Sequence, residues 1–470
     1  MRFMADNRRT TEDTFINRGG YNEIECSYTV VPEKPEKEMV QLATYGQDSR
    51  GLRKAGRMIS PKEERSRLLL ELFIENQVMQ AKKLKEEREE KYNYIPQDRE
   101  KTYVGANKNT REIVLDIANY ISQKGFVYSN EDVFNFYLAL KTKPFLILTG
   151  ISGTGKTKLV KLFAEAVGAT EENGRFKMIS VRPEWKDSSD LFGYKDQKQT
   201  FVPGQLTSII MEAIKLENRN KPFFVCLDDM NLARVEDYLS HYLSLIESRE
   251  FKGRDIVTSP LFSEAYARED LSYGNLYLPD NLYLIGTVNM DSEDNNLSRK
   301  VLDRANVIEL SQVNLHQLNF SRYTTSSIQM DNDFFKTRFL HISDAIEQDR
   351  TYVEYINEKI IAINNILKKG NRAFGYRVRD EIIFYMLENK ISGIIENENT
   401  AFDYAIMHKI LPSIRGKDDK LKYILIELYN YCNPSRQISV ASNYVDDAER
   451  FADYARYKRS AGKIAEMLNK

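Results

Sequence analysis

The chain has 470 residues and a nearly balanced charge, with 68 lysines and arginines against 69 aspartates and glutamates. The formal net charge of -1 gives no argument for a global attraction to nucleic acid or to a membrane, so any such surface must be a local patch. The three cysteines, Cys26, Cys226 and Cys432, are far apart and odd in number. This usage disfavours a disulfide framework or a zinc site and fits a reducing compartment.

The length allows two or three domains, and the apolar content of 42% is enough for a packed core. Residues 1–20 are polar and charged, unlike a signal peptide, and the apolar runs are too short to cross a bilayer. We therefore expect a cytoplasmic protein without a membrane span. The pattern divides it into an N-terminal extension (1–108), an α/β domain (109–330) and a helical domain (331–470).

The N-terminal extension is expected to be irregular at first and then helical. Residues 1–59 show little periodicity, although 24–31 could form a strand. Ser60-Pro61-Lys62-Glu63 is a capping box that begins a helix, which becomes almost wholly charged over 82–91. Glutamates balance its lysines, so a solvated helix is favoured over a nucleic-acid arm.

The α/β domain is expected to begin with helices over 110–124 and 133–140, the second capped by Ser129. An apolar strand from Phe145 then leads directly into a glycine-rich loop and a helical pattern. The loop fits G-x-x-x-x-G-K-[ST] at every fixed position and consists of Gly150, Ile151, Ser152, Gly153, Thr154, Gly155, Lys156 and Thr157, with Lys158 following.

This strand, loop and helix are typical of a nucleoside triphosphate site. Glycines let backbone N–H groups wrap around phosphates, and the N-terminus of the helix attracts the anion. Lys156 would reach the β- and γ-phosphates, and the Thr157 hydroxyl would ligate Mg²⁺. With both flanking elements in place, a chance glycine-rich turn is the weaker interpretation.

The rest of the α/β domain alternates helices with apolar strands, as in an open, mostly parallel sheet. From about residue 335 the pattern is helical only, which indicates an all-helical C-terminal domain. The expected strands are 177–181, 223–227, 282–285 and 307–310, and the expected late helices are 352–367, 380–387, 401–411, 421–431 and 460–468.

Polar residues end two of these strands. Asp228 and Asp229 follow the strand 223–227, where an acid would hold Mg²⁺ and a second acid would orient the attacking water. Asn289 ends the strand 284–289 and could hydrogen-bond that water or the γ-phosphate. Farther on, the segment 298–304 places cations on a helix, and a solvated charged face is its simplest interpretation.

These motifs together resemble the McrB-like branch of the AAA+ ATPases, the GTP-dependent motor subunits of modified-cytosine restriction systems. The resemblance extends over roughly residues 110–470. The matching segments are 150–157, 181–194 (Val-Arg-Pro-Glu-Trp-Lys-Asp-Ser-Ser-Asp-Leu-Phe-Gly-Tyr), 227–236 (Leu-Asp-Asp-Met-Asn-Leu-Ala-Arg-Val-Glu), 285–291 (Ile-Gly-Thr-Val-Asn-Met-Asp), 298–306, 374–378 and 408–412.

The resemblance implies an AAA+ P-loop core with a helical lid, assembled into a homo-oligomeric, hexameric ring with nucleotide at subunit interfaces. It makes Asn289 the sensor asparagine and Arg304 the arginine finger that reaches a neighbour's γ-phosphate, with Arg299 as second choice. It assigns Arg377 as the sensor arginine of the lid. It also implies a separate McrC-like nuclease partner, through which the complex would meet DNA.

Three features depart from that family. The acidic pair is Asp-Asp where Asp-Glu is usual, so Asp229 is one methylene shorter and turnover could be slow. Asn289 and Asp291 are separated by one residue where the family has two, which leaves a role for Asp291 open. Residues 1–100 do not resemble the modified-base-reading domains often fused to this motor, so recognition of methylated DNA is not implied.

Several functions fit these motifs. The first is an ATP- or GTP-hydrolysing ring that powers or licenses a DNA-cleaving partner in antiphage defence; the loop contacts phosphates and does not reveal the base. The second is a nucleotide-gated scaffold with little hydrolysis, which the short Asp229 favours. The third is a MoxR-like protein-remodelling ATPase, which the segment 181–194 disfavours.

Overall fold

The computed structural model describes residues 108–198, 200–262, 273, 276–290, 297–310, 326–416, 418–440 and 443–469. It also describes two short antiparallel strands, β1 (Ile16–Asn17) and β2 (Ile24–Glu25), in a separate unit formed by Met1–Lys101. The expected helix from Ser60 and the question of Asp291 lie outside the described residues, as does Cys26. The second unit, Thr102–Lys470, contains everything that follows.

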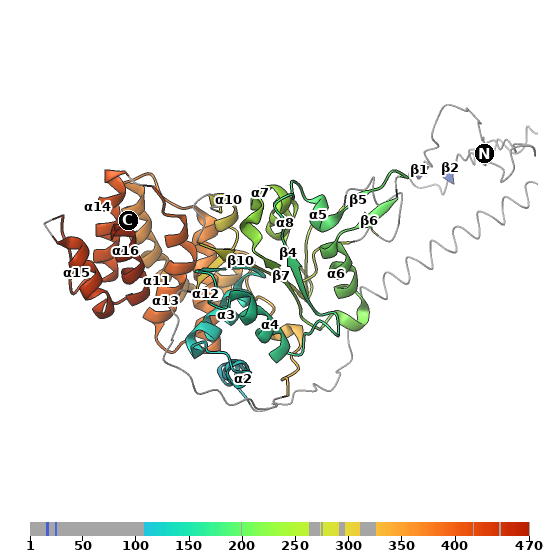
Figure 1. The fold of residues 1–470 in the computed structure, drawn as a ribbon, viewed down its shortest axis with the longest axis horizontal. Coiled ribbons are helices and arrows are strands. Elements are labelled where there is room, and N and C mark those ends of the chain that lie inside the picture. The colour runs from blue at the N-terminus through green and yellow to red at the C-terminus, as the bar shows by residue number, and fades with distance from the viewer. Residues whose placement is uncertain are drawn as a thin grey trace, which may run out of the picture. The chain divides into compact units, whose positions relative to one another are not determined.

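A five-stranded parallel sheet forms the centre of this unit (Figure 1). Its order is β11 (Asn306–Glu309), β3 (Phe145–Gly150), β10 (Leu282–Asn289), β7 (Phe223–Asp228) and β4 (Phe176–Ser180). The three central strands are almost continuously buried, as expected for parallel strands covered on both faces. The expected α/β fold with a parallel sheet is confirmed.

The register of the strands brings the predicted site residues to one edge. Gly150 at the end of β3 pairs with Asn289 at the end of β10. On the other side of β10, β7 ends in Asp228, which lies beside Ser180 of β4. Because all strands are parallel, the glycine-rich loop, the acidic pair and the asparagine share the carboxyl edge of the sheet.

Helices cover both faces of the sheet. Alternate residues of β3 join different apolar clusters: Leu146 and Leu148 pack on one face, Phe145 and Ile147 on the other. The first face carries α2 (Thr110–Gln123), α3 (Asn130–Thr142) and α4 (Lys156–Ala166). The second carries α6 (Gln205–Ala213), α7 (Val235–Tyr238), α8 (Ser240–Leu245) and α10 (Arg299–Leu302).

Two antiparallel hairpins were not predicted from the sequence. They are β5 (Gly193–Lys195) with β6 (Phe201–Pro203), and β8 (Glu250–Lys252) with β9 (Asp255–Val257). The short helix α5 (Ser189–Phe192) precedes the first hairpin. Short 3₁₀ turns complete the connections: η1 (Leu216–Asn218), η2 (Met230–Leu232), η3 (Ile246–Ser248), η4 (Asn332–Phe334), η5 (Leu411–Ser413) and η6 (Ala452–Tyr454).

The C-terminal region is helical, as expected, and shares one apolar cluster with the face of the sheet that carries α4. No helix in the described ranges is both long enough and apolar enough to cross a membrane. The division at residues 330/331 stays a prediction. The helices are α11 (Ile342–Lys368), α12 (Tyr376–Ser392), α13 (Glu398–Lys409), α14 (Asp419–Cys432), α15 (Tyr444–Phe451) and α16 (Lys458–Asn469).

Candidate active site

The loop between β3 and α4 depends on its three glycines, of which Gly150 and Gly155 are the fixed positions of the motif. Gly150, Gly153 and Gly155 all have positive φ, at 146°, 82° and 84°. At Gly150 a Cβ atom would also lie 2.4 Å from the carbonyl oxygen of Leu310, so a side chain there would collide with backbone. The loop therefore turns tightly and delivers the chain to the N-terminus of α4 at Lys156.

Lys156 folds over this loop. Its ammonium group donates hydrogen bonds to the carbonyl oxygens of Gly150, at 3.1 Å, and Ile151, at 2.8 Å, and only 5% of the residue is exposed. Thr154 closes the same turn with a hydroxyl bond of 3.1 Å to the Ile151 carbonyl. The structure thus brings the predicted phosphate-binding cation to the concave side of the loop, beside the positive end of α4.

Thr157 and Asp228 meet at the carboxyl edge of the sheet. The Thr157 hydroxyl donates to Asp228 Oδ1 at 2.6 Å, and Thr287 donates to the same oxygen at 3.0 Å. Such a hydroxyl and carboxylate are the hard oxygen ligands that Mg²⁺ takes when substrate phosphates and water supply the remainder. The residues present therefore fit the expected metal.

Asp229 is held differently from Asp228. Its backbone is left-handed, with φ of 50°, and its N–H donates to the Thr287 hydroxyl at 3.0 Å. Asn289 donates its side-chain amide to Asp229 Oδ1 at 2.6 Å. Burial raises the pKa of the Asp229 carboxyl, and the charge of Asp228 raises it further, although Lys156 acts in the opposite direction.

Two residues of the site were missed in the sequence. Thr287 lies two positions before Asn289 on β10, so both share a face of that strand, and this spacing could have revealed it. Tyr128 donates its hydroxyl to the Gly155 carbonyl at 2.8 Å, across 27 residues of sequence. Burial raises the pKa of Tyr128 to about 12, so it remains a neutral donor that supports the loop.

Lys158, expected among the nucleotide contacts, turns toward Phe126. Its ammonium lies 4.8 Å from the centre of that ring, at the side of α4. The predicted contact of Lys158 with nucleotide stays a prediction.

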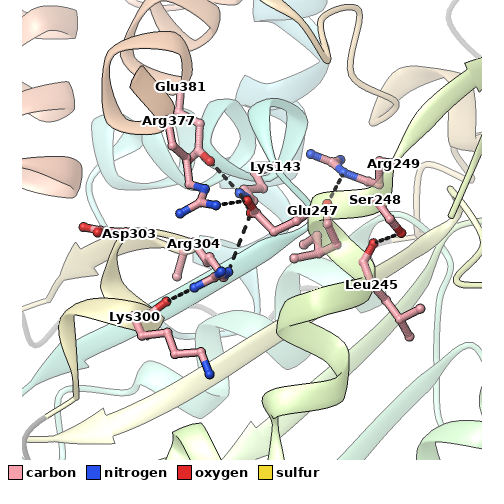
Figure 2. Close-up of polar contacts among 12 residues, drawn as sticks. Lys143, Leu245, Glu247, Ser248, Arg249, Lys300, Asp303, Arg304, Arg377 and Glu381 are labelled. Atoms are coloured by element: carbon pink, nitrogen blue, oxygen red, sulfur yellow. Dashed lines mark hydrogen bonds and ion pairs between the residues drawn. The ribbon is translucent and has the colours of Figure 1, made fainter. Parts of the chain in front are cut away.

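Two of the three candidate arginines, Arg304 and Arg377, lie at the opposite, amino edge of the sheet. Arg304 Nη1 donates to the Lys300 carbonyl at 2.9 Å, and its Nε lies 3.9 Å from Glu247 Oε1. Arg377, in the first turn of α12, forms an ion pair with Glu247 Oε2 (Figure 2). Arg299 donates to the Ala373 carbonyl at 2.6 Å.

The length of strand β3 indicates how far the glycine-rich loop lies from the residues around Glu247. Glu247 pairs with Lys143, two residues before the start of β3, whereas the glycine-rich loop begins at the last residue of β3, Gly150. Five residue steps of about 3.3 Å place the ends of β3 roughly 16 Å apart. Arg377, which the resemblance assigns to the nucleotide-binding residues, pairs with Glu247 at the amino edge, and its contact with nucleotide stays a prediction.

Comparison with known families agrees with this geometry. Residues 145–305 match the model described as an AAA domain of the dynein-related subfamily. This segment is an AAA+ P-loop NTPase domain. Residues 323–470, which contain the helices α11 to α16, match a family described only as a domain of unknown function, DUF8727. The specific McrB-like assignment is not part of either match.

Two curated proteins resemble part of this chain. The Lon protease of Clostridioides difficile is 27% identical over 300 residues, which is 62% of this chain and 32% of that protein. The Lon protease of Metamycoplasma arthritidis is 25% identical over 286 residues, 60% of this chain and 27% of that protein. The chain thus spans about a third or less of the length of these relatives.

Two solved structures are similar to this chain at low identity and low TM-score. A candidate ATPase from Cytophaga hutchinsonii is 14% identical, with a TM-score of 0.41 over 64% of this chain and 87% of that one. NtrX from Brucella abortus is also 14% identical, with a TM-score of 0.25 over 42% of this chain and 40% of that one. The AAA+ assignment therefore depends on the sheet, the site and the family match.

Proposed function

We propose that this AAA+ NTPase completes its catalytic site between subunits of a ring. The observation that carries the proposal is the separation of two half-sites within one chain. The loop, Asp228, Asp229 and Asn289 lie together at the carboxyl edge, whereas Arg304 and Arg377 lie together at the amino edge. A heterologous ring contact brings such different edges of neighbouring chains together.

The carboxyl edge would bind the triphosphate and prepare the water. Lys156 would contact the β- and γ-phosphates, and Thr157 and Asp228 would hold Mg²⁺, which neutralises developing charge on the phosphates when bound. Asp229 would orient the attacking water and accept its proton. Asn289 donates a hydrogen bond to one carboxylate oxygen of Asp229. While this bond holds the side chain in place, the other oxygen would face the water and accept its proton.

The amino edge would supply the missing positive charge. An arginine provided by a neighbouring subunit stabilises the transferring phosphoryl group and raises rates by about 10³–10⁵. Arg304 is the favoured finger and Arg377 the second cation, and both would act on the nucleotide of the next chain. We place the stoichiometry at six chains by analogy with the McrB-like proteins.

In its cellular role, we propose an McrB-like motor that licenses a McrC-like nuclease, and through it DNA cleavage, in the cytoplasm. The motifs at 181–194 and 227–236 support this assignment. The match to the dynein-related subfamily favours a second candidate, a MoxR-like ATPase that remodels proteins. The scaffold with little hydrolysis remains the third, because Asp229 is shorter than the usual glutamate.

One assay separates these candidates. ATP and GTP hydrolysis should be measured with Mg²⁺ over a range of protein concentrations, alongside sedimentation. We expect activity per chain to rise as rings form, and to rise again with the cognate nuclease and DNA. Constant activity per chain down to concentrations at which the protein is monomeric would exclude the shared site. Turnover too low to measure in assembled rings would favour the scaffold.

A further inference from the structure

Glu247 is the meeting point of three cations from distant parts of the chain. Its Oε1 lies 3.2 Å from the Lys143 ammonium and 3.9 Å from Arg304 Nε, and its Oε2 pairs with Arg377 (Figure 2). Only 24% of the Glu247 side chain is exposed. Each carboxylate oxygen thus faces one arginine, and the two arginines come from different domains of the AAA+ unit.

The surroundings of Glu247 are built to hold this arrangement. Glu381, on α12 with Arg377, bonds Lys143 at 2.5 Å and also pairs with Lys409. Burial alone would raise the pKa of Glu381, but Lys143 and Lys409 outweigh that effect and lower it to about 2. The Glu381 carboxylate therefore remains charged at neutral pH.

Lys409, the second partner of Glu381, also bonds the segment that carries Arg304. Lys409 donates to the Ala305 carbonyl at 2.7 Å, directly after Arg304. Both arginine-bearing segments are therefore fixed to one buried network of Lys143, Glu381 and Lys409. This network holds the backbones of the two segments, and Glu247 is the acid that pairs with both arginine side chains.

Two arginines that act on one phosphate must lie close together although they repel each other. Arginine remains charged at any working pH, and repulsion is stronger where water is partly excluded. The Arg304 side chain is 19% exposed and Arg377 is 39% exposed. Arg304 Nε is buried and has no hydrogen-bond partner, so the carboxylate of Glu247 is its nearest compensating charge.

We propose that Glu247 is a positioning residue that holds Arg304 and Arg377 as one pair for the triphosphate of the neighbouring chain. The proposal rests on the shared site proposed above. Glu247 lies at the amino edge, so it acts on the next subunit's reaction and not on the chain's own loop. Glutamate at this position matters for its charge, because only an anion offsets the repulsion between the arginines.

The test begins with Glu247→Gln, which keeps the shape and removes the charge. We expect kcat to fall at least about tenfold while the dissociation constant for nucleotide and ring formation by sedimentation stay within about twofold of wild type. Glu247→Asp, which keeps the charge on a shorter stem, should retain more activity. Glu250→Gln is the matched control, since Glu250 is an exposed acid on the nearby β8 and should have no effect.

A mixing experiment gives the readout that a merely structural role would not produce. Glu247→Gln subunits have an intact loop, and Lys156→Ala subunits have an intact arginine pair. Mixed rings should therefore be more active than either variant alone. The reference mixture is Arg304→Ala with Lys156→Ala.

The outcomes separate this proposal from the shared site. Recovery in the reference mixture but none with Glu247→Gln would mean that Glu247 serves its own chain, and the positioning role would be wrong. Full activity of Arg304→Ala and Arg377→Ala alone would overturn the shared site itself, and the role of Glu247 with it. If Glu247→Gln does not form rings alone, it is mixed with an excess of Lys156→Ala subunits, and absence of recovery in rings shown by sedimentation to contain both has the same meaning.

Discussion

The two edges of the sheet are organised by different forces. At the carboxyl edge, short hydrogen bonds tie Thr157 to Asp228 and Asn289 to Asp229, so acids and donors are arranged around a loop built for anions. At the amino edge, Glu247 and Glu381 face a larger set of cations that includes Lys143, Arg304 and Arg377 (Figure 2). In the proposed function, the carboxyl edge needs a positive charge for its reaction, and the amino edge supplies that charge to the next chain.

In the proposed ring, this separation makes hydrolysis depend on assembly. A single chain would bind the triphosphate with the residues of its carboxyl edge. Its own arginines lie toward the other end of β3, whose two ends are roughly 16 Å apart, and would serve the next chain. Substitutions at the two edges should therefore separate nucleotide binding from turnover.

The largest effect is expected from Lys156→Ala at the carboxyl edge. The β- and γ-phosphates lose their cation, so triphosphate binding should be lost, with at least about a hundredfold rise in the dissociation constant. Titration calorimetry measures it, with Lys161→Ala as the control, because Lys161 lies on the same helix and pairs with Glu171. Unchanged affinity would show that the loop is not the binding site.

At the amino edge, Arg304→Ala should leave that dissociation constant almost unchanged. Hydrolysis in assembled rings should fall by about 10³-fold or more, because the transferring phosphoryl group loses its stabilising charge. Steady-state turnover and equilibrium binding on the same preparation test this contrast. A variant that binds nucleotide poorly would place Arg304 among the ground-state contacts and remove the distinction between the edges.

Asp229→Asn sharpens the comparison within the carboxyl edge. The amide cannot accept the proton of the attacking water, so turnover should fall by about 10²–10⁴-fold, whereas Mg²⁺-dependent binding through Thr157 and Asp228 persists. Single-turnover hydrolysis with wild-type rings as control provides the measurement. Turnover equal to wild type would deprive Asp229 of a catalytic role and support the scaffold.

The smallest effect concerns the lid beside the amino edge. Burial, and then the charge of Lys409, lowers the pKa of His408 to about 3. Below pH of about 6.5 the unfolded chain binds a proton that the folded chain does not. The free energy of unfolding should therefore decrease as the pH is lowered, by up to about 1.4 kcal/mol for each pH unit. Urea unfolding between pH 7.5 and 5 should show this slope, and His408→Phe should flatten it. Equal slopes in both proteins would contradict the assignment.

The sequence was sufficient for the carboxyl edge because its signals are local. An apolar run, three glycines and a lysine follow one another between Phe145 and Lys156, and Asp228 ends an apolar strand. Parallel pairing then brings these strand ends together without further information. Asn289 was found by the same rule, and Thr287 could have been.

The amino edge could not be predicted in this way. Glu247 meets Lys143 across 104 residues and Arg377 across a longer stretch, so no local pattern marks it. Arg377 was assigned as a sensor arginine by resemblance, and the resemblance does not say at which edge of the sheet this residue lies. The hairpins β5–β6 and β8–β9 were missed because strands of three residues carry too little alternation to be recognised.

The most direct test of the central claim is hydrolysis by rings mixed from Lys156→Ala and Arg304→Ala subunits. Each variant lacks one half of every interface, but a mixture pairs intact loops with intact arginines. At a ratio of 1:1, about a quarter of the interfaces in a randomly mixed ring are complete. We predict that the mixture recovers up to that fraction of wild-type turnover, although each variant alone is nearly inactive. A mixture no more active than the average of its components would show that the site is complete within one chain.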